Sequence, residues 1–338
     1  AKAGLTHVHL LPAFDIATID EDAAHRKEIR RAVLNRLPPD SDRQAAAIEA
    51  LAGADGYSWG YDPYHFTVPE GSYASDPEGA TRTLEFRGMV QCLNAIGLRT
   101  IMDVVYNHTN ASGQSEKSVF DRIVPGYYHR LNGEGDVENS TCCENTASEH
   151  ALMEQFMIDS LRVWAREYKV DGFRFDLMGH HMLSNMLAIR AALDALSLEK
   201  DGVDGKAILL YGEGWNFGEV ANGARGRNAI QENLGGSGIG SFNDRVRDAL
   251  RGGSPFGDPR TSGFASGLFF DRAAGASQER SRLESGDWVR LGLAGNLRDY
   301  TLETITGPRR GEHISYGGGA AAYALEPRET INYAGAHD

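Results

Sequence analysis

Two stretches of the sequence decide the predicted fold: Asp171-Gly-Phe-Arg-Phe-Asp176-Leu and Leu210-Tyr-Gly-Glu213-Gly-Trp215. Each is an apolar run typical of a buried strand, and each ends in a carboxylate. Because successive side chains of a strand point to opposite faces, we expect Arg174 and Asp176 to share one face. A single helix-like stretch separates the two runs. They are therefore predicted to be neighbouring parallel strands, one strand–helix unit apart.

Strands and helices alternate along the rest of the chain, which predicts a parallel α/β architecture. The predicted helices are 81–96, 148–168, 182–197 and 243–251, and the predicted strands are 5–11, 98–105, 171–177, 207–213, 239–242 and 330–335. An eight-stranded barrel needs two more strands. We therefore predict one (β/α)8 TIM-type barrel domain over residues 1–338, truncated at both ends, with its first and last strands missing. The polar, Ala-rich residues 20–55 are predicted to be a loop insertion in that domain.

The helix predicted over residues 148–168 has a regular apolar pattern. Leu152, Phe156, Leu161 and Trp164 fall on one helical stripe, and this stripe is expected to face the core.

The three cysteines do not predict a disulfide framework. Cys92 lies in a helical pattern and is expected to be a small buried hydrophobic residue. Cys142 and Cys143 are adjacent, so a bond between them would be strained and would join no distant segments.

Composition excludes several classes of partner. The chain has 338 residues, of which 41% are hydrophobic and 24% charged, and its net charge is −13. This charge disfavours nucleic acid and anionic membranes and suits a neutral substrate such as a sugar. The sequence has no apolar run of 18 residues, and residues 1–20 lack the layout of a secretion signal.

Two carboxylates at neighbouring strand ends suit glycosidic bond cleavage, in which one acts as nucleophile and the other as proton donor. The alternative is that Arg174 and Asp176 form a structural ion pair and Glu213 is a solvated loop acid. Two further strand ends carry similar residues, in Asp103-Val-Val-Tyr-Asn-His108 and in the terminal His337-Asp338.

These four clusters resemble, in order, the four sequence regions of the α-amylase superfamily. Tyr57-Ser-Trp-Gly-Tyr61-Asp-Pro63, followed by Val68-Pro-Glu-Gly-Ser-Tyr-Ala74, resembles the signature of its debranching members. Longer stretches are similar to the pullulanase and limit dextrinase branch, and most of all to plant-type limit dextrinases. They include Ile123–Tyr128, Thr146–His150, Tyr168–His180 and Leu293–Tyr300, so the resemblance covers residues 4–338.

The resemblance implies a catalytic role for each of three acids. Asp176 matches the nucleophile, Glu213 the general acid/base, and Asp338 the third acid, which binds ring hydroxyls. Arg174 matches the arginine that keeps the nucleophile ionised. A cation beside a carboxylate lowers its pKa by roughly 1–3 units.

The resemblance also implies a set of substrate-binding residues. His108 and His337 match the histidines that bind sugar hydroxyls in the cleavage subsite, and Tyr61 matches the aromatic platform beneath it. Trp215 and Phe256 are expected to line the neighbouring subsites.

The sequence departs from the family pattern at two positions. Ser58 stands where the debranching signature usually has Asn, and Asn216 stands where an Asp usually follows Gly-Glu-Gly-Trp. The departure at Asn216 is expected to affect function more than the one at Ser58. In the family, a carboxylate at this position helps to set the pKa of the acid/base and binds sugar.

The implied function is a retaining hydrolase of α-1,6 branch linkages in pullulan, limit dextrins and amylopectin fragments. It needs no organic cofactor. Structural calcium is compatible with the family, although the sequence has no Asp-x-Asp-x-Asp loop. The resemblance fits a plastid, or the bacterial cytoplasm or exterior, without choosing between them.

Two other functions compete with this one. One is a non-catalytic or inactive α-glucan-binding homologue. The other is a metal-dependent hydrolase on the same barrel, suggested by His7-Val-His9. Arg174 beside Asp176 argues against the metal-dependent hydrolase, because a fixed cation repels a divalent metal.

We expect residues 1–338 alone to be aggregation-prone and nearly inactive. An open barrel exposes unpaired strand edges and an apolar face. Unpaired backbone groups cost about 1–3 kcal/mol each when buried, against a total stability of about 5–15 kcal/mol. Calorimetry and pullulan hydrolysis test this, and a cooperatively melting, fully active 338-residue chain would contradict it.

Overall fold

A computed structural model describes residues 3–258, 260–268 and 276–337. The chain forms two compact units. Unit 1 comprises Ala1–Asp176 and Ala188–Leu209, and unit 2 comprises Leu177–Leu187 and Leu210–Asp338. Across the described ranges, no helix is both long enough and apolar enough to cross a lipid bilayer.

Unit 1 is built on three parallel strands in the order β1-β4-β7. The register between β4 and β7 places Asp103 opposite Arg174. The elements of this unit are β1 (His7–Leu10), β2 (Phe14–Ile16), α1 (Arg31–Leu34), α2 (Arg43–Glu49), β3 (Pro63–Pro69), α3 (Thr81–Ala95), β4 (Arg99–Val104), β5 (His108–Thr109), α4 (Phe120–Ile123), β6 (Glu144–Asn145), α5 (Ala151–Glu167), β7 (Gly172–Phe175) and α7 (Leu198–Asp201). Helix α6 (Leu183–Asp194) is divided between the two units.

The core of unit 1 contains a cluster of aromatic rings. Phe66 stacks on Phe120 and Tyr106, with ring centroids 5.4 and 5.7 Å apart, and meets Phe156 edge-on. Trp164 on α5 is fully buried and donates its indole N–H to the Phe66 carbonyl at 2.9 Å. These contacts hold α5 against β3.

The buried face of α5 differs from the predicted stripe at one position. Met153, Met157 and Leu161 are fully buried, whereas Leu152 is 51% exposed. The helix begins at Ala151, so Leu152 lies in its first turn, to one side of the face that Met153 begins.

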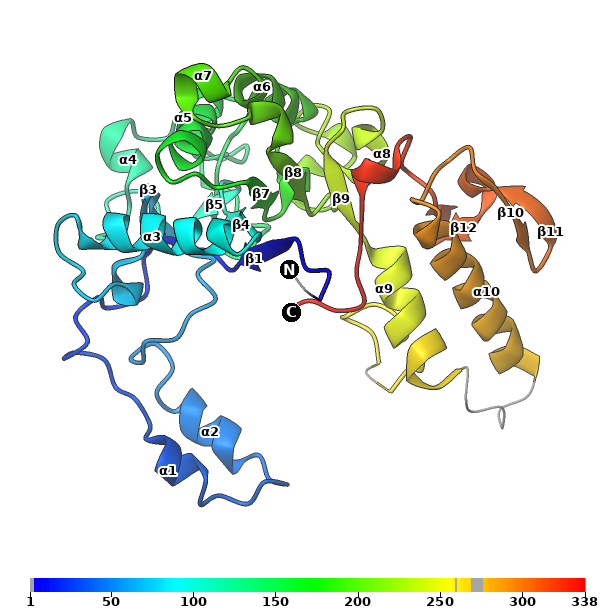
Figure 1. Ribbon diagram of the computed structural model, residues 1–338, viewed down its shortest axis with the longest axis horizontal. Helices are drawn as coiled ribbons and strands as arrows, with labels where there is room; N and C mark the ends of the chain where they lie inside the picture. Colours follow the sequence, from blue (N-terminus) through cyan, green and yellow to red (C-terminus); the bar gives the residue numbers. More distant parts are fainter. Residues whose placement is uncertain (1–2, 259, 269–275, 338) are drawn as a thin grey trace. The chain divides into compact units, whose positions relative to one another are not determined.

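Residues 20–55 carry α1 and α2, which lie apart from β1 and α3 in Figure 1. Neither helix has a buried residue. The assignment of this segment as an insertion into a barrel stays a prediction.

Unit 2 also has three parallel strands, in the order β8-β9-β14. Its elements are β8 (Leu209–Gly212), α8 (Gln231–Leu234), β9 (Gly240–Asn243), α9 (Asp244–Arg251), α10 (Ala276–Leu293), β10 (Thr301–Thr304), β11 (Gly307–Arg310), β12 (Ser315–Tyr316), β13 (Gly319–Ala320) and β14 (Thr330–Asn332). Helices α9 and α10 lie side by side (Figure 1). Leu291, Leu302 and Ile314 form a small core against which Trp288 packs.

The six strands predicted from the sequence are all present, three in each unit. The described residues therefore contain six parallel strands of the predicted architecture, and the complete (β/α)8 barrel stays a prediction. The four predicted helices correspond to α3, α5, α6 and α9. Helix α10 was not predicted.

Candidate functional site

A buried ion-pair network lies where β4 and β7 end. Arg174 Nη1 donates to both oxygens of Asp103, at 2.9 Å each, and to Asp176 Oδ1 at 3.0 Å. This contact confirms the prediction that Arg174 and Asp176 share one face. The exposed fractions are 0% for Asp103, 4% for Arg174 and 8% for Asp176. One guanidinium thus binds two carboxylates, and all three groups are almost completely shielded from solvent.

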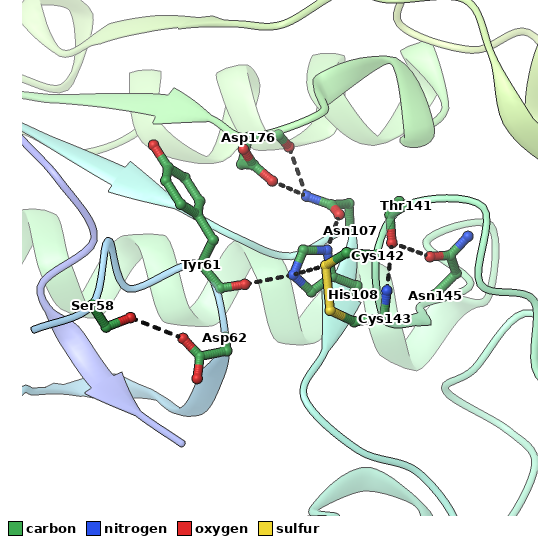
Figure 2. Close-up of a disulfide and its surroundings, with 10 residues drawn as sticks. All are labelled: Ser58, Tyr61, Asp62, Asn107, His108, Thr141, Cys142, Cys143, Asn145 and Asp176. Atoms are coloured by element: carbon green, nitrogen blue, oxygen red, sulfur yellow. Dashed lines mark hydrogen bonds between the residues drawn. A yellow bond between two sulfur atoms is a disulfide. The ribbon is translucent and has the colours of Figure 1, made fainter. Parts of the chain in front are cut away.

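Asn107 fixes the other side of Asp176. Its Nδ2 donates to Asp176 Oδ2 and to the Asp176 carbonyl, both at 2.9 Å (Figure 2). These two donations orient the amide, so that Asn107 Oδ1 points to His108 Nδ1 at 2.6 Å. The Asp176 carboxylate is therefore held on one oxygen by Arg174 and on the other by Asn107.

His108 faces a hydrogen-bond acceptor at each ring nitrogen. Nδ1 meets Asn107 Oδ1, and Nε2 meets the Tyr61 carbonyl at 2.6 Å. Each ring nitrogen that carries a proton can donate to the acceptor it faces. His108 therefore links Asn107, which holds Asp176, to the Tyr61 carbonyl.

Tyr61 is linked to the same network through its hydroxyl group, which donates to Asp103 Oδ2 at 2.7 Å. The Arg174 guanidinium carbon lies 5.6 Å from the centre of the Tyr61 ring. Burial, followed by the Asp103 charge, raises the pKa of Tyr61 far above its ordinary value. The phenol is therefore neutral and remains a donor.

Burial raises the pKa of Asp176 above its ordinary value, and the Asp103 charge raises it further. Arg174, His108 and the Asn107 amide lower the pKa, but burial outweighs them. The sequence predicted only the lowering by Arg174. The difference arises because Arg174 is shared with Asp103 and because burial removes the Asp176 carboxylate from solvent.

We predict that Asp103→Asn moves the acid limb of the kcat/KM profile to lower pH. The substitution removes a negative charge, so the pKa of Asp176 falls and the carboxylate stays ionised in more acidic buffer. The amide oxygen can still accept from Tyr61. The matched control is Asp159→Asn on the exposed side of α5, which should leave the limb in place. An upward shift for Asp103→Asn would show the charge argument to be wrong.

Glu213 lies in unit 2, directly after β8, and is half-buried. Its Oε2 accepts the backbone N–H of Leu177 at 3.0 Å, and its carbonyl accepts the Gly179 N–H at 2.9 Å. Leu177 follows Asp176 in the chain and has φ 41° and ψ 48°, a left-handed conformation that costs a non-glycine residue about 1–3 kcal/mol. This strained turn directs its N–H to the Glu213 carboxylate.

Trp215 and Asn216, which follow Glu213 in the chain, each make defined contacts. The Trp215 carbonyl packs so closely on Gly179 that a Cβ there would lie 2.0 Å from it. Asn216 is exposed and pairs with Asn222, donating to its side-chain oxygen at 3.0 Å and accepting its backbone N–H at 2.8 Å.

Two of the remaining predicted site residues, Phe256 and His337, lie in unit 2. Phe256 is 99% exposed, on the turn after α9. His337 is exposed beyond β14. Asp338 lies outside the described residues. The roles predicted for these three residues stay predictions.

Comparisons with known proteins were made for sequence and for structure. No family model matches the chain. It is 51% identical over 344 residues to "Pullulanase 1, chloroplastic" of Arabidopsis thaliana, a match that covers 99% of this chain and 36% of the relative. It is 40% identical over 380 residues to a pullulanase of Klebsiella pneumoniae, covering all of this chain and 34% of the relative. The chain thus spans about a third of the length of these relatives.

Its homologues are pullulanases. Solved structures agree: PulA of Klebsiella pneumoniae in complex with maltotriose superposes with a TM-score of 0.92 at 40% identity, covering all of this chain and 40% of that one. A maltotriose complex of a pullulanase mutant from Paenibacillus barengoltzii gives a TM-score of 0.70 at 34% identity, covering 98% of this chain and 41% of that one. The pullulanase homologues are glycoside hydrolases.

The predicted site residues omitted two that the structure places at the centre of this pullulanase-like network. Asp103 pairs with Arg174, and Asn107 holds Asp176. Both residues belong to the sequence cluster Asp103–His108, which lies at a predicted strand end. Their place in this cluster is the sequence feature that could have identified them as site residues.

Two groups of three possible metal ligands occur among the described residues, and neither includes His7 or His9. One is Asp15, Glu21 and Glu70, where Arg82 pairs with Glu21 and lies 3.6 Å from Asp15. The positive charge of Arg82 already offsets the negative charge of these carboxylates, which is what a bound calcium ion would do.

The second group is His108, Cys142 and Cys143. Cys142 and Cys143 are joined by a disulfide, which links no distant segments. The prediction that Cys92 is buried was wrong. Cys92 is exposed rather than buried, because it lies on the outer side of α3, whose buried residues are Phe86 and Val90.

Proposed function

We propose that this chain carries the catalytic machinery of a retaining hydrolase that cleaves α-1,6 branch linkages in pullulan, limit dextrins and related α-glucans. The observation that carries the proposal is a buried carboxylate, Asp176, held by Arg174 and Asn107 in a chain whose homologues are pullulanases along its whole length.

Asp176 is proposed as the nucleophile. Its Oδ1 and Oδ2 are each held by one donor, so the carboxylate is fixed in orientation before a substrate arrives. Attack on the anomeric carbon would form a glycosyl ester and expel the leaving sugar oxygen. The positive charge of Arg174 favours the ionised form that this step needs.

Glu213 is proposed as the general acid/base. It protonates the leaving oxygen in the first step and takes a proton from the attacking water in the second. The Leu177 N–H donates to Oε2 and so helps to orient the carboxyl group. The retaining mechanism requires the two carboxyl groups to lie about 5–5.5 Å apart on one glycosidic bond.

Substrate binding is assigned by the resemblance. His108, His337 and Tyr61 are proposed to contact the sugar in the cleavage subsite, and Asp338 its ring hydroxyls. Trp215, Asn216 and Phe256 are proposed for the neighbouring subsites. No organic cofactor takes part, and calcium would have a structural role if bound.

Linkage specificity tests this proposal. The full-length protein should release maltotriose from pullulan with retention of the anomeric configuration and leave linear amylose largely intact. Chromatography and NMR of the first product measure both, and the Asp176→Asn protein serves as the blank for contaminating hydrolases. Rapid hydrolysis of amylose with pullulan untouched would make the protein an ordinary amylase.

A further inference from the structure

The Cys142–Cys143 disulfide lies beside His108, as Figure 2 shows. Cys142 Sγ is 3.8 Å from His108 Nε2, and the two sulfurs and a ring nitrogen of His108 all lie within 4.8 Å of one another. Cys142 is exposed and Cys143 is half-buried. A reductant in solution therefore reaches the disulfide directly.

The loop that carries the two cysteines is held by contacts that do not involve sulfur. Strand β6 pairs with β5 so that Asn145 lies opposite His108. The Thr141 hydroxyl donates to Asn145 Oδ1 at 2.6 Å and accepts the Cys143 N–H at 3.3 Å. Breaking the S–S bond leaves these contacts intact, so both thiols would remain next to His108.

Reduction of this disulfide is a balanced exchange with a dithiol. The dithiol gives up two electrons and two protons, closes to its own disulfide, and leaves Cys142 and Cys143 as thiols. Two thiolates and one imidazole are the ligands that Zn²⁺ and similar soft cations prefer.

We propose that the reduced chain binds one soft divalent cation, such as Zn²⁺ or Cd²⁺, through Cys142, Cys143 and His108. The two thiols release their protons to solvent on binding, and Nε2 of His108 becomes a ligand once it has lost its proton. Water fills the fourth position of a tetrahedral site. The oxidised chain has no thiolates to offer and does not form this site.

Binding would also alter the neighbourhood of Asp176. Nε2 now donates to the Tyr61 carbonyl, and a ligand nitrogen cannot do so. His108 would leave the Tyr61 carbonyl, and its contact with Asn107 would change. If the proposed function holds, the bound cation inhibits hydrolysis, and a chelator reverses the inhibition.

The test is a Cd²⁺ titration of the full-length protein in a Cys92→Ser background, which removes the third cysteine of residues 1–338. The protein is reduced with dithiothreitol, freed of it under anaerobic conditions, and followed by the thiolate–cadmium charge-transfer absorbance. We expect one equivalent to bind to the reduced protein and none to the oxidised protein, a comparison that needs no variant of the site.

Cys142→Ser, Cys143→Ser and His108→Asn should each weaken binding by at least about 10-fold, since even second-shell changes cost a metal site that much. Equal binding before and after reduction, or no binding to the reduced protein, would overturn the proposal. So would full retention of binding in the Cys142→Ser/Cys143→Ser double variant. The titration is independent of activity, so a protein that binds Cd²⁺ but never hydrolyses pullulan would contradict the proposed function alone.

Discussion

In the full-length protein, Asp176→Asn should lower kcat on pullulan by at least about 10⁴-fold while the protein still folds normally. The amide has the shape of the carboxylate but cannot form a glycosyl ester. Folding should survive, because Arg174 keeps both of its bonds to Asp103 and Asn107 is held by the Asp176 carbonyl as well as by the side chain.

Pullulan hydrolysis and thermal melting together test this prediction. The matched control is Asp159→Asn, the same chemical change on the exposed side of α5, which should leave both rate and melting temperature unchanged. An activity drop of less than tenfold would show that Asp176 is not the nucleophile. A large drop accompanied by loss of the melting transition would instead assign it a structural role.

Glu213→Gln should have an equally large effect on pullulan, of at least about 10⁴-fold in kcat, for a different reason. The sugar leaving group needs a proton, and the amide has none to give. A substrate that leaves without protonation, such as maltotriosyl fluoride, should still react once with Asp176. The glycosyl-enzyme would then accumulate, because no base activates the water of the second step.

Mass spectrometry of the intact protein detects this adduct, and digestion should place it on Asp176. The Asp176→Asn/Glu213→Gln double variant is the matched control, because it lacks the nucleophile and should form no adduct. The assignment of Glu213 as acid/base would be contradicted by an adduct in the double variant. It would also be contradicted by a Glu213→Gln enzyme whose rate on pullulan lies within tenfold of the wild-type rate.

The parallel strands could be predicted because burial on both faces leaves them as short continuous apolar runs. The run 171–177 and the strand β7 coincide, and the face shared by Arg174 and Asp176 follows from strand alternation alone. The contact of Arg174 with Asp103 could not be derived in this way, because it depends on the register between two strands far apart in sequence.

Most of the rest of unit 2 could not be predicted, and α10 shows why. This 18-residue helix buries Ser285 and Asp287 along with Leu291, so no apolar stripe marks its inner side. The sequence also left open whether Cys142 and Cys143 are joined, because this depends on the loop conformation, which sequence spacing does not specify.

The left-handed turn at Leu177 has a consequence for engineering this protein. The left-handed conformation of Leu177 lowers the stability of the fold, but it places the Leu177 N–H where it donates to Glu213. Glycine at 177 would relieve the strain and would also loosen that donor, so heat resistance obtained there should come with a slower enzyme. Attempts to make the protein more thermostable should therefore leave this turn unchanged.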